Sequence, residues 1–480
     1  MKKLLLITLF VCSMGTFTAC GSENPELENE NLQTTTSETE SPKTTAPENE
    51  NSQTTISETV EGNTSEKEAE VIIDKEEIQE ETSSESIEMV EEQSQVVEKS
   101  QILSLQEIRK VKYEGIGDYE KLLMISEFNY ITFWEGTETY PKMAHMMSEI
   151  ADRIMRSTEE LADDMVGFAQ EIFDVNGGNF ETQISTAEEQ VRRADGVVVS
   201  CLTDSYADYG FIRGVRGMVG SNYDTQTGQQ LALTDVIKDM TQIPALVEKE
   251  LNTHLMPGDS YSETAIQNYF QNTPEDGINW TLDYNGVTFY FGNGELTEPG
   301  NGRQTATISF AEYPELFEEK YMNVPDAYMV RLSLDSSFFT DLDGDGTLEA
   351  LNVTGLYNEE ERFYSEFGIS IDTDGAYYYE DFFAYGYNPY YVKTADGKHY
   401  LYLFCEENEA DNRQMMLVVF DISGGQLTRV GEMNVAPAYI PSDSFILPLN
   451  PNYMLLDNFD SQEQDFGIYM VGENGMPVKK

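Results

Sequence analysis

Residues 141–172 read PKMAHMMSEIADRIMRSTEELADDMVGFAQEI, and this stretch decides the fold class. Its apolar residues recur three or four positions apart, which predicts one amphipathic helix about eight turns long. They are Met143, Met146, Met147, Ile150, Ile154, Leu161, Met165, Phe168 and Ile172. Pro141 suits the first turn of such a helix. The methionines suit either a packed core or an adaptable partner groove, and core packing is favoured.

Strand-like runs lie on both sides of this helix. An extended stretch, 121–133, precedes it, and each later run ends at turn residues such as Asp, Asn or Gly. The later strands are expected at 180–184, 196–203, 209–223, 278–282, 286–291 and 304–310, with a second helix at 243–255. A long helix among strands predicts an α+β domain over 104–325.

The region from 326 to 480 has a different pattern. After Pro325 it consists almost wholly of strand-like runs, separated by Asp-Gly or Gly-Gly pairs that are typical of tight turns. These pairs begin at Asp343, Asp374, Asp396 and Gly424. We expect a second, β-rich domain here.

An acidic loop in this second region has the spacing of a calcium site. Calcium binds hard oxygen ligands, and carboxylates at alternate positions of a tight turn converge on one point. The candidate ligands are the side chains of Asp341, Asp343, Asp345 and Glu349 and the carbonyl of Thr347. An EF-hand is disfavoured, because Asn352 stands where the bidentate Glu belongs. The motif resembles the loop between strands in integrin-type propeller repeats. Calcium is therefore the predicted cofactor, and a solvated acidic turn is the alternative.

Tyrosines are concentrated in the same region, which holds eleven aromatic residues between positions 377 and 402. Tyr is favoured in strands, so core and sheet packing explain most of them. Because Tyr pairs an apolar ring with a polar tip, some could instead form a recognition face for sugar or protein. The candidates for such a face are Tyr377, Tyr378, Tyr379, Tyr390 and Tyr391.

The N-terminal hundred residues predict an export signal and a tether. Residues 1–19 combine a basic start with a short apolar run, as signal peptides do, and end in small residues before Cys20. This pattern resembles the bacterial lipobox, so we expect cleavage before Cys20, a lipid on that cysteine and a location on the outer face of the cell membrane. Residues 20–103 are rich in Glu, Thr and Ser and predict a disordered linker.

The formal net charge is −58, which disfavours nucleic-acid binding and favours calcium or basic proteins as partners. Beyond the signal and the anchor, the cysteines are Cys201 and Cys405. They could form one disulfide or remain two buried thiols. No recognisable set of catalytic residues is present, although carboxylates are so abundant that a glycosidase pair stays open.

The first folded region resembles the RsiV-like extracytoplasmic domain, a domain of unknown function. The most specific segment is NYDTQTGQQLALTDVI, residues 222–237, which lies between DGVVVS at 195–200 and the strands GVTFYF at 286–291 and ATISF at 306–310. The family occurs in lysozyme-sensing anti-sigma factors and beside deacetylase domains. Neither a sigma-factor-binding segment nor a deacetylase domain is recognised here, so the resemblance implies an extracytoplasmic binding role.

The expected function is therefore that of a non-enzymatic surface lipoprotein. Its acidic, calcium-stabilised ectodomain would bind a cationic protein such as lysozyme, or a cell-envelope component. Charge complementarity with a basic partner would speed their encounter. The alternative is an envelope hydrolase that uses carboxylate catalysis.

Overall fold

A computed structural model describes most of the chain from residue 99 to 480. The described ranges are 99–116, 121–176, 180–210, 214–255, 261–296, 303–334, 336–358, 363–372, 375–407, 415–440, 444–459 and 465–480. The expected signal peptide, Cys20 and the linker up to residue 98 lie outside them.

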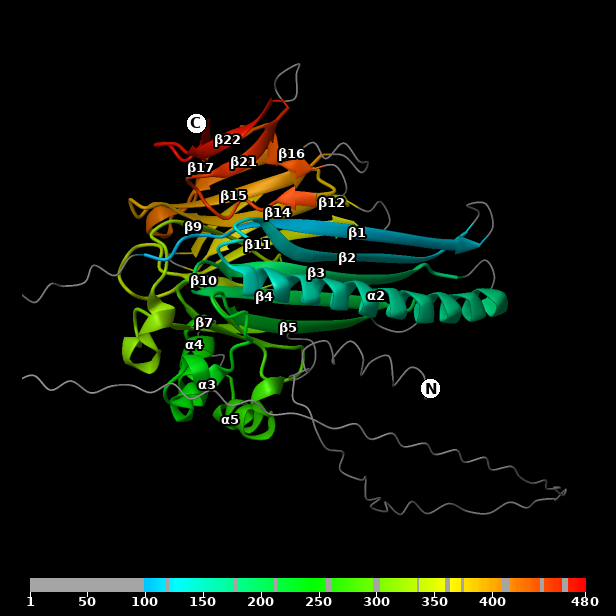
Figure 1. The fold of residues 1–480 in the computed structure, drawn as a ribbon, viewed down its shortest axis with the longest axis horizontal. Coiled ribbons are helices and arrows are strands. Elements are labelled where there is room, and N and C mark those ends of the chain that lie inside the picture. The colour runs from blue at the N-terminus through cyan, green and yellow to red at the C-terminus, as the bar shows by residue number, and fades with distance from the viewer. Residues whose placement is uncertain are drawn as a thin grey trace, which may run out of the picture. The chain divides into compact units, whose positions relative to one another are not determined.

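A seven-stranded sheet organises the first folded region (Figure 1). Its strand order is β19-β20-β1-β2-β3-β4-β5. The bounds are Ser104–Ile116 for β1, Lys121–Glu135 for β2, Gln183–Ala194 for β3, Val198–Asp208 for β4, Val215–Asp224 for β5, Tyr439–Ile440 for β19 and Ser444–Ile446 for β20. Neighbouring strands are antiparallel except β2 and β3, which are parallel. A parallel pair needs a crossover, and the long helix between these two strands supplies it.

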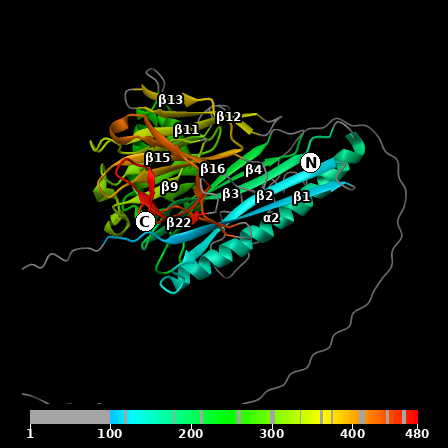
Figure 2. The same cartoon turned by 90° about the horizontal axis from the view of Figure 1, so that it is seen from above.

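The predicted long helix is confirmed as α2, Pro141–Asn176. It lies along one side of β1 to β4, while the C-terminal strands lie on the other side (Figure 2). Met143, Met147 and Met165 are fully or almost fully buried. The methionine stripe is therefore core, as the spacing favoured, and not an exposed partner groove.

The middle of the chain covers one end of this sheet with short helices and a three-stranded sheet. The helices are α3 Leu233–Val236, α4 Ile243–Thr253 and α5 Glu263–Asn272, and the strands are β6 Trp280–Leu282, β7 Gly286–Phe291 and β8 Gln304–Ser309. The second helix and these three strands are confirmed. The expected strands at 180–184 and 209–223 were wrong in their bounds, because β3 runs from 183 to 194, β4 ends at Asp208 and β5 begins at Val215.

The C-terminal region is β-rich, as predicted. Its sheets have the orders β10-β11-β12-β13, β17-β16-β15-β14-β9 and β18-β21-β22-β23. The bounds are β9 Tyr328–Arg331, β10 Phe338–Thr340, β11 Glu349–Asn358, β12 Phe363–Ile371, β13 Ala376–Glu380, β14 Gly386–Lys393, β15 His399–Glu406, β16 Met415–Asp421, β17 Thr428–Met433, β18 Val435–Pro437, β21 Met454–Asn458, β22 Asp465–Val471 and β23 Pro477–Lys479. Together with α2 and the seven-stranded sheet, this makes a β-rich α+β fold.

The two folded regions share structure across residue 325. Strand β20 comes from the C-terminal region but pairs with β1, with Ser444 opposite Ile108 and Ile446 opposite Gln106. The described residues all belong to one compact unit. A domain division at 325 therefore stays a prediction.

Cys201 and Cys405 are both buried free thiols. The two alternatives for them were one disulfide or two buried thiols, and the structure has the second.

Buried arginines connect β3 to the segments packed on it. Arg193 is fully buried, and its Nε donates to Asp195 Oδ2 at 2.8 Å. Its Nη atoms donate to the backbone carbonyls of Tyr321 at 2.7 Å and Asn323 at 3.3 Å. Asp195 in turn accepts the N–H groups of residues 197 and 198. The guanidinium group thus bonds to two carbonyls that lie outside the sheets.

In the part of the chain that the structure describes, no helix has both the length and the apolar character needed to cross a bilayer.

Candidate functional site

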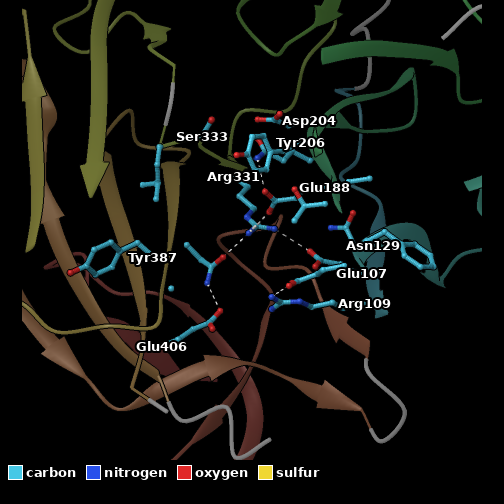
Figure 3. A pocket seen from close by; sticks show the side chains of 18 of the residues that line it. Glu107, Arg109, Asn129, Glu188, Asp204, Tyr206, Arg331, Ser333, Tyr387 and Glu406 are labelled. Atoms are coloured by element: carbon cyan, nitrogen blue, oxygen red, sulfur yellow. Dashed lines mark hydrogen bonds and ion pairs between the residues drawn. The ribbon is translucent and has the colours of Figure 1, made fainter. Parts of the chain in front are cut away.

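A polar cleft of about 460 Å³ lies between the seven-stranded sheet and the C-terminal strands (Figure 3). Alternate residues of a strand point to the same face, so each strand of the sheet contributes side chains spaced by two. The sheet supplies Glu107 and Arg109 from β1, Glu127 and Asn129 from β2, Glu188 from β3, Asp204 and Tyr206 from β4 and Arg216 from β5. The opposite wall supplies Arg331 from β9, Tyr387 and Asn388 from β14 and Glu406 from β15.

Arg331 joins the two walls of the cleft. Its Nη1 lies 3.2 Å from Glu107 Oε2, and its Nη2 lies 2.6 Å from both Glu188 Oε1 and Asn388 Oδ1 (Figure 3). Asn388 Nδ2 then donates to Glu406 Oε1 at 2.9 Å. The network holds side chains of β1, β3, β9, β14 and β15 in fixed positions before any ligand arrives, which lowers the entropy lost on binding.

Burial and the ion pairs shift the pKa values of this network in opposite ways. Burial raises the pKa of Glu107, and the nearby positive charge of Arg331 reduces that rise without cancelling it. Burial alone would lower the pKa of Arg331, but the carboxylates of Glu188 and Glu107 more than offset it and leave the net pKa above its usual value. Arg331 is therefore a permanent cation in the cleft.

The cleft lining carries a negative excess. Five carboxylates and three guanidinium groups line it, so the net formal charge is −2. The carboxylates belong to Glu107, Glu127, Glu188, Asp204 and Glu406, and the guanidinium groups to Arg109, Arg216 and Arg331. Arg109 pairs with Glu127, and Arg216 lies over the ring of Tyr206, 5.3 Å from its centroid. A cleft of this kind suits a ligand with hydrogen-bond donors or positive charge.

Aromatic rings form one side of the cleft. Tyr357, Tyr364 and Tyr387 contact one another in sequence, with ring centroids 4.9 Å and 5.0 Å apart. Tyr357 is 44% exposed. Such rings give a ligand an apolar contact beside the polar groups, as sugar rings and extended peptides require.

The tyrosines expected as a recognition face are not brought together. Tyr377 and Tyr379 are exposed on β13, but Tyr378 is half-buried and packs against Phe367 and Phe420. Tyr390 and Tyr391 are only 3% and 0% exposed. The expectation was wrong for this last pair, because β14 lies inside its sheet and both of its faces are covered by core side chains.

The predicted calcium loop brings three of its carboxylates together. Oxygens of Asp341, Asp343 and Asp345 all lie within 4.8 Å of one another. The N–H groups of Gly344 and Gly346 donate to the two oxygens of Asp341 at 2.7 Å and 3.1 Å. Both glycines have a positive φ, 83° and 93°, which this tight turn requires. Three converging hard oxygens on a closed turn fit a calcium ion.

Of the other two expected ligands, Glu349 lies outside this group, and the Thr347 carbonyl stays a prediction. The carboxylate of Glu349 accepts the N–H of Leu342 at 2.6 Å and is not part of the converging group. Its pKa is raised by burial, an effect to which the three nearby aspartates add. The N–H of Thr347 donates to Asp345 Oδ1 at 2.7 Å, which closes the end of the turn.

The cleft was missed by sequence reasoning, although a signal for it exists. Charged residues recur inside strands, as at Glu107, Arg109 and Glu188. A charge inside a strand needs a partner or a solvated face. The sequence does not say which strands will face each other, and so it could not show that these charges meet at Arg331.

Comparisons with known proteins give partial matches to solved structures. No protein-family model matches the chain, and no curated protein matches its sequence. Two solved structures of the DUF3298 family, a domain of unknown function, are similar to it. One, from Bacteroides fragilis, is 15% identical, covers 46% of this chain and 96% of its own, and has a TM-score of 0.37. The other, from Pseudomonas aeruginosa, is 14% identical, covers 47% of this chain and 99% of its own, and has a TM-score of 0.31.

Proposed function

We propose that this chain is a non-enzymatic surface lipoprotein that binds a cationic protein or a cell-envelope component in the cleft around Arg331. A lipid on Cys20 would hold it on the outer face of the cell membrane. The observation that carries the proposal is the lining of the cleft, where carboxylates outnumber guanidinium groups and tyrosine rings form one side. Lysozyme, a basic protein, and wall fragments with many hydroxyl groups are the two ligand types that match it.

The organisation of the cleft supports binding more than catalysis. Its buried charges are already paired, with Arg331 holding two carboxylates and an amide. Such pairs orient a ligand by offering fixed hydrogen-bond acceptors, and they add specificity and a faster encounter more than raw affinity. The negative charge of the whole chain would attract a basic partner at long range.

The cleft variant Glu188→Gln/Glu406→Gln is expected to weaken binding about tenfold, or about 1.4 kcal/mol. Glutamine keeps the size and the acceptor oxygen but removes the charge. Binding of lysozyme and of soluble wall fragments to the full chain would be measured by calorimetry at low and at high salt. Glu159→Gln, an exposed position on α2, is the matched control and should leave affinity unchanged. Equal affinity for the cleft variant and the control would contradict the proposal.

We also propose that Asp341, Asp343 and Asp345 hold a calcium ion that stabilises the C-terminal strands. Calcium at 100 times its Kd would add about 2.7 kcal/mol to the free energy of unfolding. The melting temperature of the full chain should therefore rise when calcium is added and fall when it is chelated. Asp343→Ala should abolish this response, because it removes one of the converging carboxylates.

The control for calcium is Asp396→Ala, which removes an exposed carboxylate at another Asp-Gly turn. It should keep the full calcium response. A melting temperature that ignores calcium in the unaltered chain would refute the metal assignment.

One observation favours a second candidate, the envelope hydrolase. Because Glu107 and Glu188 both contact one guanidinium group, their oxygens lie at most about 8 Å apart, a limit that is compatible with the spacing of paired glycosidase carboxylates. The raised pKa of Glu107 suits a general acid. If this candidate is right, the full chain releases reducing ends from wall polysaccharide and Glu107→Gln stops the release. If the binding proposal is right, no release is measured with either form.

A further inference from the structure

Strand β5 forms one edge of the seven-stranded sheet, with β4 as its only neighbour in the sheet among the described residues. Edge strands in soluble proteins are commonly protected by charged side chains, bulges or a covering segment. Between Arg216 and Asp224, β5 carries no charged side chain. Its pairing with β4 also runs without a register shift from Val215 to Asp224. The strand is thus a regular edge with little of the usual protection.

The backbone of β5 has outward-facing groups at alternate residues. Near its C-terminal end these groups are used: the carbonyl of Asn222 accepts the N–H of Leu231, and the N–H of Asp224 donates to the carbonyl of Gln229. Alternation places the backbone groups of Met218 and Gly220 on the same edge. Within the described ranges, no backbone group pairs with them.

A groove of about 600 Å³ runs along this open part of the edge. One wall consists of five consecutive residues of β5, from Arg216 to Gly220. Residues 230–233, 275–280, 292 and 295 form the rest. The groove is therefore bounded on one side by the strand edge and on the other by loops and β6.

The loop side of the groove is acidic. Glu275, Asp276 and Glu295 are all exposed there. Glu275 accepts the N–H of Thr234 at 3.0 Å, and Glu295 accepts the N–H of Gly292 at 2.7 Å, so both carboxylates are held in place. Among the residues that line this groove, Arg216 is the one basic side chain, and it also lines the cleft around Arg331.

We propose that this groove binds an extended, lysine- or arginine-rich segment of a partner protein, which adds to the sheet as a strand beside β5. The partner backbone would bond to the outward groups of Met218 and Gly220, as in strand addition to other exposed sheet edges. Its basic side chains would lie against Glu275, Asp276 and Glu295. This site is separate from the network around Arg331 and does not rest on the function proposed for that network.

The negative charge of the groove favours a basic partner segment over two other occupants of an open edge, a second copy of the chain and the chain's own segment 21–98. A second copy of the chain would bring an identical set of three carboxylates to the groove, and like charges at short range repel. The chain's own segment 21–98 is rich in Glu, so it would meet the same repulsion.

The test uses the full chain and a synthetic heptapeptide of alternating lysine and valine, blocked at both ends. In an extended peptide, alternate N–H groups point to opposite edges. Two further peptides carry N-methyl groups either on the lysines or on the valines, which leaves the charge unchanged. One methylated peptide should lose at least tenfold in affinity, and the other should stay within threefold of the parent. Hydrogen exchange of the Met218 and Gly220 amides should slow when the parent peptide binds.

The protein variants separate the groove from the rest of the acidic surface. The variant Glu275→Gln/Glu295→Gln keeps one acceptor oxygen at each position but removes both charges. It should weaken peptide binding about tenfold. Glu263→Gln, at an exposed position on the nearby helix α5, should not change it. Glu188→Gln/Glu406→Gln should not change it either, which distinguishes the groove from the cleft.

Four results would overturn the proposal. They are no binding of the parent peptide, equal binding of both methylated peptides, dimers of the chain that the peptide dissociates, and slow exchange of the Met218 and Gly220 amides before any peptide is added. The third would assign the edge to a second copy, and the fourth to a segment of the chain itself.

Discussion

Replacing Arg193 with methionine is expected to lower the free energy of unfolding by about 3–5 kcal/mol, the usual effect of breaking a buried ion pair from one side. Arg193 is fully buried and donates to Asp195 and to the carbonyls of Tyr321 and Asn323. Methionine fills much of the space but donates nothing. Asp195 would keep a buried charge without its partner, and two carbonyls would lose their donors. Urea unfolding of the full chain, monitored by tryptophan fluorescence, measures the change.

Two further variants test the cause of this destabilisation. Arg156→Met makes the same substitution at an exposed position of α2, and it should change stability by less than about 0.5 kcal/mol. Arg193→Met/Asp195→Asn should regain part of the loss, because asparagine carries no charge and can still accept the N–H groups of residues 197 and 198. A double variant as unstable as Arg193→Met alone would show that the unpaired charge is not the main cause.

The stability of the chain is expected to fall as pH rises from about 4.5 to 7 because of Glu189. Burial raises the pKa of this carboxyl to about 7. The folded protein therefore keeps a proton that the unfolded chain releases near its ordinary pKa of about 4.5. Across that interval the unfolded state binds fewer protons, so stability declines with pH and levels off above 7. A shift of this size corresponds to about 3 kcal/mol.

Glu189→Gln should remove this decline, because glutamine has no proton to lose. The variant should be more stable than the unaltered chain at pH 8 and nearly equal to it at pH 4. Its amide can still accept the N–H of Ile131, as the carboxyl does at 3.2 Å. Glu159→Gln, on the exposed face of α2, should keep the decline. Parallel curves for Glu189→Gln and the unaltered chain between pH 4 and 8 would contradict the assignment.

Local sequence patterns were sufficient to predict much of the fold. The spacing of Met143, Met147 and Met165 predicted a core-facing helix, because a period of 3.6 residues puts them on one stripe. Asp-Gly pairs marked turns between strands in the second region. The pattern failed at β3, a mostly polar strand that contains Glu188, Glu189, Arg192 and Arg193. Those charges are compatible with a strand because partners from β2, β9, the β6–β7 turn and the segment after β8 meet them, and these partners are distant in sequence.

The sequence by itself determined the class of the fold, the long helix and the acidic turn at 341–349. Each of these follows from patterns among residues that are close together in the sequence. Tertiary structure alone decided which charges became a site. Glu107, Glu188 and Arg331 come from three strands far apart in the chain, and they meet because two sheets face each other. It also decided that Tyr390 and Tyr391 are core, and that β5 is an edge. Those outcomes depend on what packs against each strand, and a strand's own residues do not specify its neighbours.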